Sequence, residues 1–126
     1  MTTVAMDTSA LMAPVECDVR VFEELDRLLG SYEPVVPVAV RDELETLSAG
    51  SGEAATAASV GADLADERCR VLGTDAGYAD DALVELAADG RCDRVVTNDG
   101  PLRERISEQG IRAIGVRGRN KLETYD

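Results

Sequence analysis

Four short acidic stretches carry the side chains of this sequence that could do chemistry. They span residues 6–11, 40–44, 79–83 and 96–99. In the first and the last, an aspartate, Asp7 or Asp99, closes a short apolar run. In an open parallel sheet, the carboxyl ends of the strands and the loops after them line the ligand crevice. The pattern therefore predicts a group of carboxylates along one edge of a sheet.

Carboxylates at close range repel one another, so such a group needs protons or cations between its members. Carboxylate oxygens suit Mg²⁺ and Mn²⁺. Each aspartate alone has a simpler interpretation. The run Asn98-Asp99-Gly100-Pro101 is also a turn and helix-start signal, and Asp80 and Asp81 suit the first turn of a helix. The combination, rather than any one residue, favours a metal centre.

The bulk composition bounds the remaining possibilities. With 126 residues, of which 44% are hydrophobic, we expect a single domain over 1–126. The chain contains no histidine, which excludes His-based triads and most zinc chemistry, and its three scattered cysteines argue against a disulfide framework. No apolar run approaches the roughly 18–20 residues that span a bilayer, and no signal peptide is evident, so we expect a cytoplasmic protein.

The charge distribution is uneven. The net charge is −12 and the only lysine is Lys121, a composition for which a halophilic source is our favoured explanation. Residues 1–99 carry 7 basic and 21 acidic residues, whereas residues 100–126 carry 6 basic and 4 acidic ones. We expect a basic polar tail at about 117–126. The basic side chains of residues 100–126 form either a solvated face and tail or contacts to nucleic-acid phosphates; they are Arg103, Arg105, Arg112, Arg117, Arg119 and Lys121.

The elements that must position these groups alternate along the chain. Apolar runs predict strands at 4–6, 34–36, 69–72, 94–97 and 111–116. Helical spacing predicts helices at about 18–30, 37–48, 53–67, 80–88 and 101–110, with Asp18 as the cap of the first and a loop at 8–10. Alternation of this kind indicates an α/β fold, a three-layer α/β/α domain with a central parallel sheet of about five strands.

Several chemistries are excluded because their motifs are missing. The chain has no GxxxxGK[ST] phosphate loop, and no GxGxxG follows a strand. Ser9 stands where an aspartate-phosphorylating hydrolase needs its second aspartate. A phospho-receiver domain needs a lysine at a late strand end, whereas Lys121 lies beyond the last predicted strand.

The four stretches, taken in order, resemble the PIN-domain ribonucleases over nearly the whole chain. The matching pieces are Asp7-Thr8-Ser9-Ala10-Leu11, the run from Val36 to Leu44, Tyr78-Ala79-Asp80-Asp81-Ala82-Leu83, and Thr97-Asn98-Asp99 with Leu102-Arg103. The third piece and the basic end look most like archaeal homologues of the eukaryotic PIN nuclease that cuts small-subunit ribosomal RNA precursor. The VapC toxins are the neighbouring branch.

This resemblance implies a PIN-like domain that cleaves single-stranded RNA with Mg²⁺ or Mn²⁺. The implied catalytic and metal-binding carboxylates are Asp7, Glu43, Asp80 and Asp99, with Asp81 as the alternative to Asp80. Thr8, Ser9 and Thr97 would support them through hydroxyls, together with Asn98. The basic residues placed for RNA contact are Arg103, Arg105, Arg117, Arg119 and Lys121.

One position departs from the family pattern. PIN nucleases often carry an acidic or polar residue two positions after the last strand-end aspartate, and here that position is Pro101. The number of metals, one or two, therefore stays open. Three roles follow: an rRNA-processing endoribonuclease, a VapC-type toxin with an antitoxin partner, or a catalytically degenerate module that binds RNA or scaffolds a complex. Homodimers are common in the family.

Overall fold

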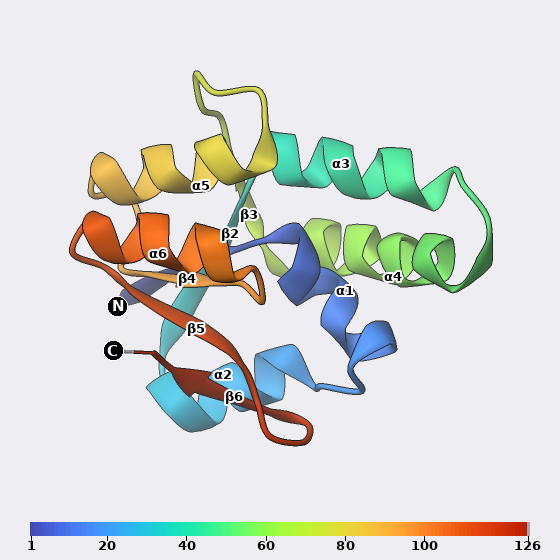
Figure 1. The fold of residues 1–126 in the computed structure, drawn as a ribbon, viewed down its shortest axis with the longest axis horizontal. Helices are drawn as coiled ribbons and strands as arrows, with labels where there is room; N and C mark the ends of the chain where they lie inside the picture. Colours follow the sequence, from blue (N-terminus) through green and yellow to red (C-terminus); the bar gives the residue numbers. More distant parts are fainter. Residues whose placement is uncertain (126) are drawn as a thin grey trace.

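The computed structural model describes residues 1–125 (Figure 1). The helices are α1 (Thr8–Glu16), α2 (Val21–Leu29), α3 (Val38–Ser48), α4 (Gly52–Arg68), α5 (Ala79–Ala88) and α6 (Gly100–Glu108). The strands are β1 (Thr2–Met6), β2 (Tyr32–Pro37), β3 (Arg70–Leu72), β4 (Arg94–Val96), β5 (Arg112–Arg117) and β6 (Lys121–Thr124). The three-layer α/β fold is confirmed, with six strands in place of about five.

The strands form one sheet in the order β3-β2-β1-β4-β5-β6, and all neighbours are parallel except β5 and β6. From β1 the chain moves outward through β2 and β3, then returns to the other side of β1 with β4. Crossover connections share one hand, so this reversal puts helices on both faces of the sheet. The β1–β4 pair is the switch point, the usual place for a ligand crevice.

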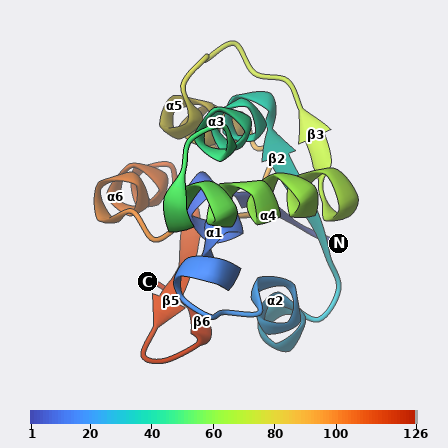
Figure 2. The ribbon, with the colours of Figure 1, turned by 90° about the vertical axis from the view of Figure 1, so that its right-hand side faces the viewer.

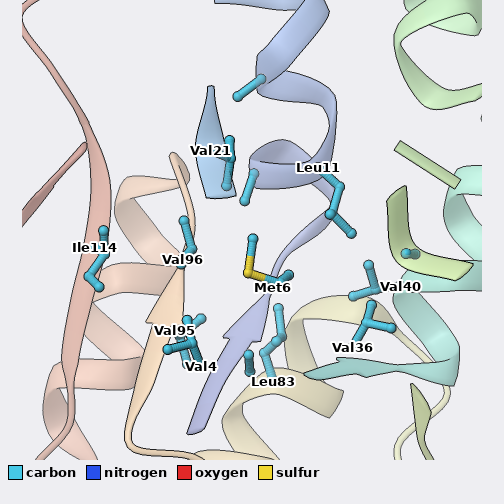
Figure 3. Packing of buried hydrophobic residues seen from close by; sticks show 14 of the residues in the cluster. Val4, Met6, Leu11, Val21, Val36, Val40, Leu83, Val95, Val96 and Ile114 are labelled. Atoms are coloured by element: carbon cyan, nitrogen blue, oxygen red, sulfur yellow. The ribbon is translucent and has the colours of Figure 1, made fainter. Parts of the chain in front are cut away.

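The core of the molecule is almost entirely aliphatic. Met6 at the end of β1 is fully buried, and Figure 3 shows it among side chains from neighbouring strands and helices, including Val36, Val96 and Leu83. Helix α4 packs closely on α1 (Figure 2). Gly61 allows this close approach, since a Cβ there would lie only 2.9 Å from the carbonyl oxygen of Leu11.

Two predictions about the amino-terminal part were wrong. Residues 8–10, expected as a loop, open helix α1, which begins directly at the strand end with Asp7 as its cap. Asp18 does not cap the next helix, because its backbone has φ 52°, in the left-handed region, and α2 begins at Val21 after Arg20. Short helices with an interior proline, here Pro14, give a weak periodic signal.

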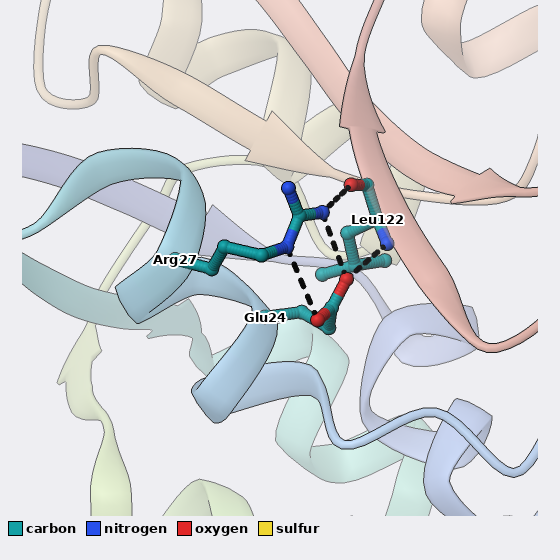
Figure 4. Close-up of polar contacts among 3 residues, drawn as sticks. All are labelled: Glu24, Arg27 and Leu122. Carbon is teal, nitrogen blue, oxygen red and sulfur yellow. Dashed lines mark hydrogen bonds and ion pairs between the residues drawn. The ribbon is translucent and has the colours of Figure 1, made fainter.

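The segment 117–126, expected as a basic polar tail, instead contains strand β6; Asp126 lies outside the described residues. Leu122 of β6 is 1% exposed, and side chains of α2 bind both its backbone amide and its backbone carbonyl (Figure 4). Glu24 accepts a hydrogen bond from the Leu122 amide at 3.0 Å, and Arg27 donates one to the Leu122 carbonyl at 2.8 Å. Side-chain contacts from α2 therefore dock the last strand.

Helix length and apolarity also bear on the membrane question. Within residues 1–125, no helix is both long enough and apolar enough to cross a bilayer.

Candidate active site

Asp7 lies where β1 ends and α1 begins, and it is 4% exposed. Its Oδ1 accepts a hydrogen bond from the amide of Thr8 at 2.7 Å. Its Oδ2 accepts one from the Ser9 hydroxyl at 3.0 Å and one from the Thr97 hydroxyl at 2.6 Å. The carboxylate is thus held in one orientation by groups that directly follow β1 and β4, the two strands of the switch point.

The same two hydroxyls connect Asp7 to the loop after β4. Thr97 Oγ1 accepts from the amide of Asp99 at 3.1 Å, and Ser9 Oγ accepts from the amide of Asn98 at 3.0 Å. Asn98 Oδ1 in turn accepts from the Val116 amide of β5 at 3.0 Å. Small changes in this loop are therefore transmitted to the Asp7 carboxylate.

Asp99 follows β4 and caps α6, where its Oδ1 accepts from the Leu102 amide at 3.0 Å. Asp80 lies in the first turn of α5. The negative charge of Asp99 raises the pKa of Asp80, after partial burial as the larger cause. Asp80 in the first turn of α5 and Asp99 at the start of α6 therefore lie close enough for their charges to interact.

The pKa of Asp7 is also raised above its ordinary value of 3.8. Burial is the main cause, and the charge of Asp80 adds to it, while the hydrogen bonds from Thr97, Thr8 and Ser9 act in the opposite direction. The two carboxyls differ in their surroundings: Asp7 is buried, whereas Asp80 is exposed and its pKa is raised by partial desolvation and by the charges of Asp99 and Asp81. A carboxyl with a raised pKa takes up a proton more readily than an ordinary aspartate, and a cation beside it relieves the same repulsion.

Asp81 and Glu43 are placed differently. Asp81 forms an ion pair with Arg105 of α6 at 2.9 Å, which leaves Asp80 as the free acid of α5. Glu43 is exposed on α3 and has no hydrogen bond or ion pair within residues 1–125. Glu43 is not among the charges that act on Asp7 or Asp80, whereas the charge of Asp81 still raises the pKa of Asp80 despite the ion pair with Arg105.

The five basic residues predicted for RNA contact differ in whether they are paired with a carboxylate. Arg105 pairs with Asp81, and Arg117 pairs with Glu123 of β6 at 3.2 Å. Arg119 and Lys121 are exposed at the turn between β5 and β6, and within residues 1–125 they form no ion pair. Arg103 stacks on the ring of Tyr125, 4.1 Å from its centroid.

Whether these residues fit a divalent cation can be tested on the polar atoms around Asp7. The hydroxyl of Thr8 is buried and has no hydrogen-bond partner, so Thr8 supports Asp7 through its amide rather than its hydroxyl. Among residues 1–125, no group of three or more acidic, cysteine or histidine side chains is placed to hold a metal ion. Mg²⁺ is usually held by one or two carboxylates and several waters, and Asp7 with Asp80 fits that smaller number of protein ligands.

Two residues near the site were not predicted to have a role. Tyr78 lies directly before α5 and is 80% exposed; the sequence analysis includes it in a matching motif but gives it no function. Gly115 of β5 is buried behind the site, where a Cβ would lie 2.8 Å from the Thr97 carbonyl oxygen and 2.7 Å from the Tyr125 ring. No signal in the sequence marks Gly115, because the close approach is tertiary.

The reversed parallel sheet, with strand-end carboxylates at its switch point, defines the class of protein to which this chain belongs. Residues 4–119 match the PIN like domain family, so the chain is a member of it. The expected resemblance to PIN domains is confirmed at this level. Among curated proteins, none matches the chain.

Two solved structures are similar over almost the whole chain. The PIN domain endonuclease Utp24 superposes with a TM-score of 0.79 at 29% identity, covering 97% of this chain and 90% of the other. A domain of a functionally unknown protein from Methanocaldococcus jannaschii gives 0.68 at 19% identity, covering 94% and 93%. The second likeness shows the fold alone, whereas the first is to a structure described as an endonuclease.

Proposed function

We propose that this chain is a Mg²⁺- or Mn²⁺-dependent endoribonuclease that cuts single-stranded RNA. The observation that carries the proposal is the placement of Asp7 and Asp99 directly after the paired strands β1 and β4, with Asp80 near both: beyond the effect of burial, the charge of Asp80 raises the pKa of Asp7 and the charge of Asp99 raises the pKa of Asp80. Membership of the PIN like domain family and the similarity to a PIN domain endonuclease support it.

The roles of the residues follow from their placement. Asp7, Asp80 and Asp99 would hold the cation, and Ser9 and Thr97 keep the Asp7 carboxylate in its orientation. When bound, the cation would neutralise charge on the scissile phosphate and lower the pKa of a water molecule. The ring of Tyr78 beside Asp80 is exposed, and an exposed aromatic ring at such a place can stack on a base of single-stranded RNA.

Within this function we favour processing of ribosomal RNA precursor over a VapC-type toxin role. The support is the resemblance of the Tyr78–Leu83 block and the basic carboxyl-terminal quarter to the rRNA-processing branch. RNA is thus the proposed partner, in the cytoplasm, with a homodimer or an antitoxin as further partners to test. A small antitoxin gene directly upstream would favour the toxin role instead.

The test is cleavage of a labelled single-stranded RNA by purified protein with Mn²⁺ or Mg²⁺, against EDTA. Asp7→Asn, Asp80→Asn and Asp99→Asn should each lower the rate at least about 100-fold, since loss of a ligand costs more than loss of its outer partner. Asp63→Asn, on the exposed side of α4, is the matched control and should cut normally. Asp81→Asn and Glu43→Gln test the two acids outside the group.

Two outcomes would contradict the proposal. Cleavage that continues in EDTA would exclude a divalent cation as the essential group. RNA binding without cleavage in either metal, retained in all three variants, would make the chain a degenerate RNA-binding module. The observation that favours this second function is that Glu43 is exposed on α3 and forms no ion pair within residues 1–125.

A further inference from the structure

A groove of about 410 Å³ lies between α6 and β5. Its position is one helical turn from the acidic site, since the amide of Arg103 in its wall donates to the carbonyl of Asp99. The volume is within the range of pockets that take small organic ligands. The residues that line it are Arg103, Glu104, Ser107, Gly110, Ile111, Arg112, Ala113 and Tyr125.

Two arginines in this groove are available to an anion. Within residues 1–125, neither Arg103 nor Arg112 forms a salt bridge, in contrast to Arg105 and Arg117. Arg112 is exposed at the start of β5. The acid on the same wall is Glu104, which has no hydrogen-bond partner among the described residues. Two guanidinium groups without a carboxylate partner among the described residues, the half-buried Arg103 and the exposed Arg112, are a local exception on a body of net charge −12 and favour phosphate.

The position of Arg103 is fixed by stacking. Its guanidinium lies 4.1 Å from the centroid of the Tyr125 ring, and Arg117 lies 5.1 Å from the same centroid. The Tyr125 hydroxyl donates to the Val116 carbonyl at 3.1 Å, and its amide donates to Ala113 at 2.8 Å. The ring is therefore anchored on β5, and it holds the Arg103 donors in place before any ligand binds. Ile111 and Ala113 supply an apolar wall for a sugar or base.

We propose that this groove binds one nucleotide of a single-stranded RNA, with its phosphate at Arg103 and Arg112. The inference rests on the proposed function for the nature of the polymer, and it adds a binding site separate from the acidic group. A strand crossing the site at Asp99 would continue along α6 into the groove. Arg112 thereby becomes an RNA-binding residue, while Arg105 and Arg117 serve their carboxylate partners.

The test is a nuclear magnetic resonance titration of ¹⁵N-labelled protein with uridine 5′-monophosphate in EDTA, so that no cation can hold the phosphate at the acidic site. We expect amide shifts at Ser107, Gly110 and Ala113. Arg112→Ala should weaken binding about tenfold, the effect of losing one charge-assisted hydrogen bond. Glu104→Gln should tighten binding, a gain that misfolding does not produce.

Arg20→Ala is the control, because it makes the same charge change directly before α2, where Arg20 forms an exposed ion pair with Glu23. It should leave the dissociation constant unchanged. Equal weakening by Arg20→Ala and Arg112→Ala, or shifts at Asp7 and Asp99 instead of the groove, would overturn the inference. Uridine or inorganic phosphate binding as tightly as the nucleotide would overturn the assignment of a whole nucleotide.

This result is independent of cleavage. A wild-type protein that never cuts RNA but binds the nucleotide through Arg112 would refute the proposed enzyme and keep the groove. A protein that cuts RNA but shows no nucleotide shifts in the groove would refute the groove alone.

Discussion

At the scale of single residues, the candidate site is defined by how Asp7 is held. Sequence reasoning placed Asp7, Glu43, Asp80 and Asp99 near one another because each lies at the end of an element or in a first helical turn. It favoured Asp80, which leaves Leu83 on the packed face of α5, and kept Asp81 as the alternative because both suit the first turn. The ion pair of Asp81 with Arg105 separates them, and that pair depends on how α5 and α6 pack.

The raised pKa of Asp7 leads to a prediction about stability. Its folded-state pKa exceeds the unfolded value, so the folded chain binds more protons between the two, and stability falls as pH rises through that window. Asp7→Asn should therefore raise the melting temperature of the metal-free protein at neutral pH. The difference should disappear as the pH falls below the raised pKa of Asp7.

Metal ions should reverse the order of the melting temperatures of the wild type and Asp7→Asn. Mn²⁺ binds the folded state and should raise the melting temperature of the wild type but not of Asp7→Asn. The apparent affinity should fall as the pH drops through the raised pKa values of Asp7 and Asp80, because protons compete for the same oxygens. Thermal denaturation with and without Mn²⁺, across pH, measures both effects. An equal metal effect on both proteins would place the cation elsewhere.

At the scale of elements, the first five strands could be predicted from the sequence, whereas the last one, β6, could not. Apolar runs identified β1, β2, β4 and β5 because each has a buried face that leaves a pattern. In β6 only Leu122 is fully buried, so the strand resembles a polar tail in sequence. It is a strand because α2 and β5 supply partners for its backbone, and the α2 contacts connect residues 95 and 98 positions apart.

The docking of β6 can be tested at Glu24, whose side chain is 17% exposed. Its hydrogen bonds with Arg27 and the Leu122 amide lower the pKa of Glu24. The stabilisation is thus present above the ordinary pKa and is lost as the pH falls through the lowered one. At neutral pH, Glu24→Ala should reduce the free energy of unfolding by about 1 kcal/mol.

Glu23→Ala is the matched control for this experiment. Glu23 is the neighbouring acid, with its side chain 69% exposed and paired with Arg20 at 3.4 Å, so its removal should have almost no effect. Urea denaturation of both variants supplies the comparison. If the two lose the same stability, α2 does not hold β6 by this contact.

At the scale of the whole molecule, charge outweighs any single pair. A net charge of −12 on 126 residues makes the folded state repel itself. The Debye length falls from about 30 Å at 0.01 M salt to about 3 Å at 1 M, so added KCl should raise the melting temperature. This is also how a halophilic source would show itself in the purified protein.

A charge-reduced variant separates screening from general salt effects. Glu53→Gln combined with Glu67→Gln removes two exposed charges from α4, and its melting temperature should depend less steeply on KCl. A wild-type melting temperature that does not change with salt would show that self-repulsion is unimportant here. Equal slopes for both proteins would assign the effect to salt in general.

The close packing around Gly115 has a consequence for how the candidate site forms during synthesis of the chain. Asp7 leaves the ribosome 90 residues before its partner Thr97. The carbonyl of Thr97 and the ring of Tyr125 both lie against Gly115, in the space that a side chain there would fill. A nascent chain therefore carries Asp7 long before the wall behind it can close. The candidate site is completed only after the segment from Thr97 to Tyr125 has been made.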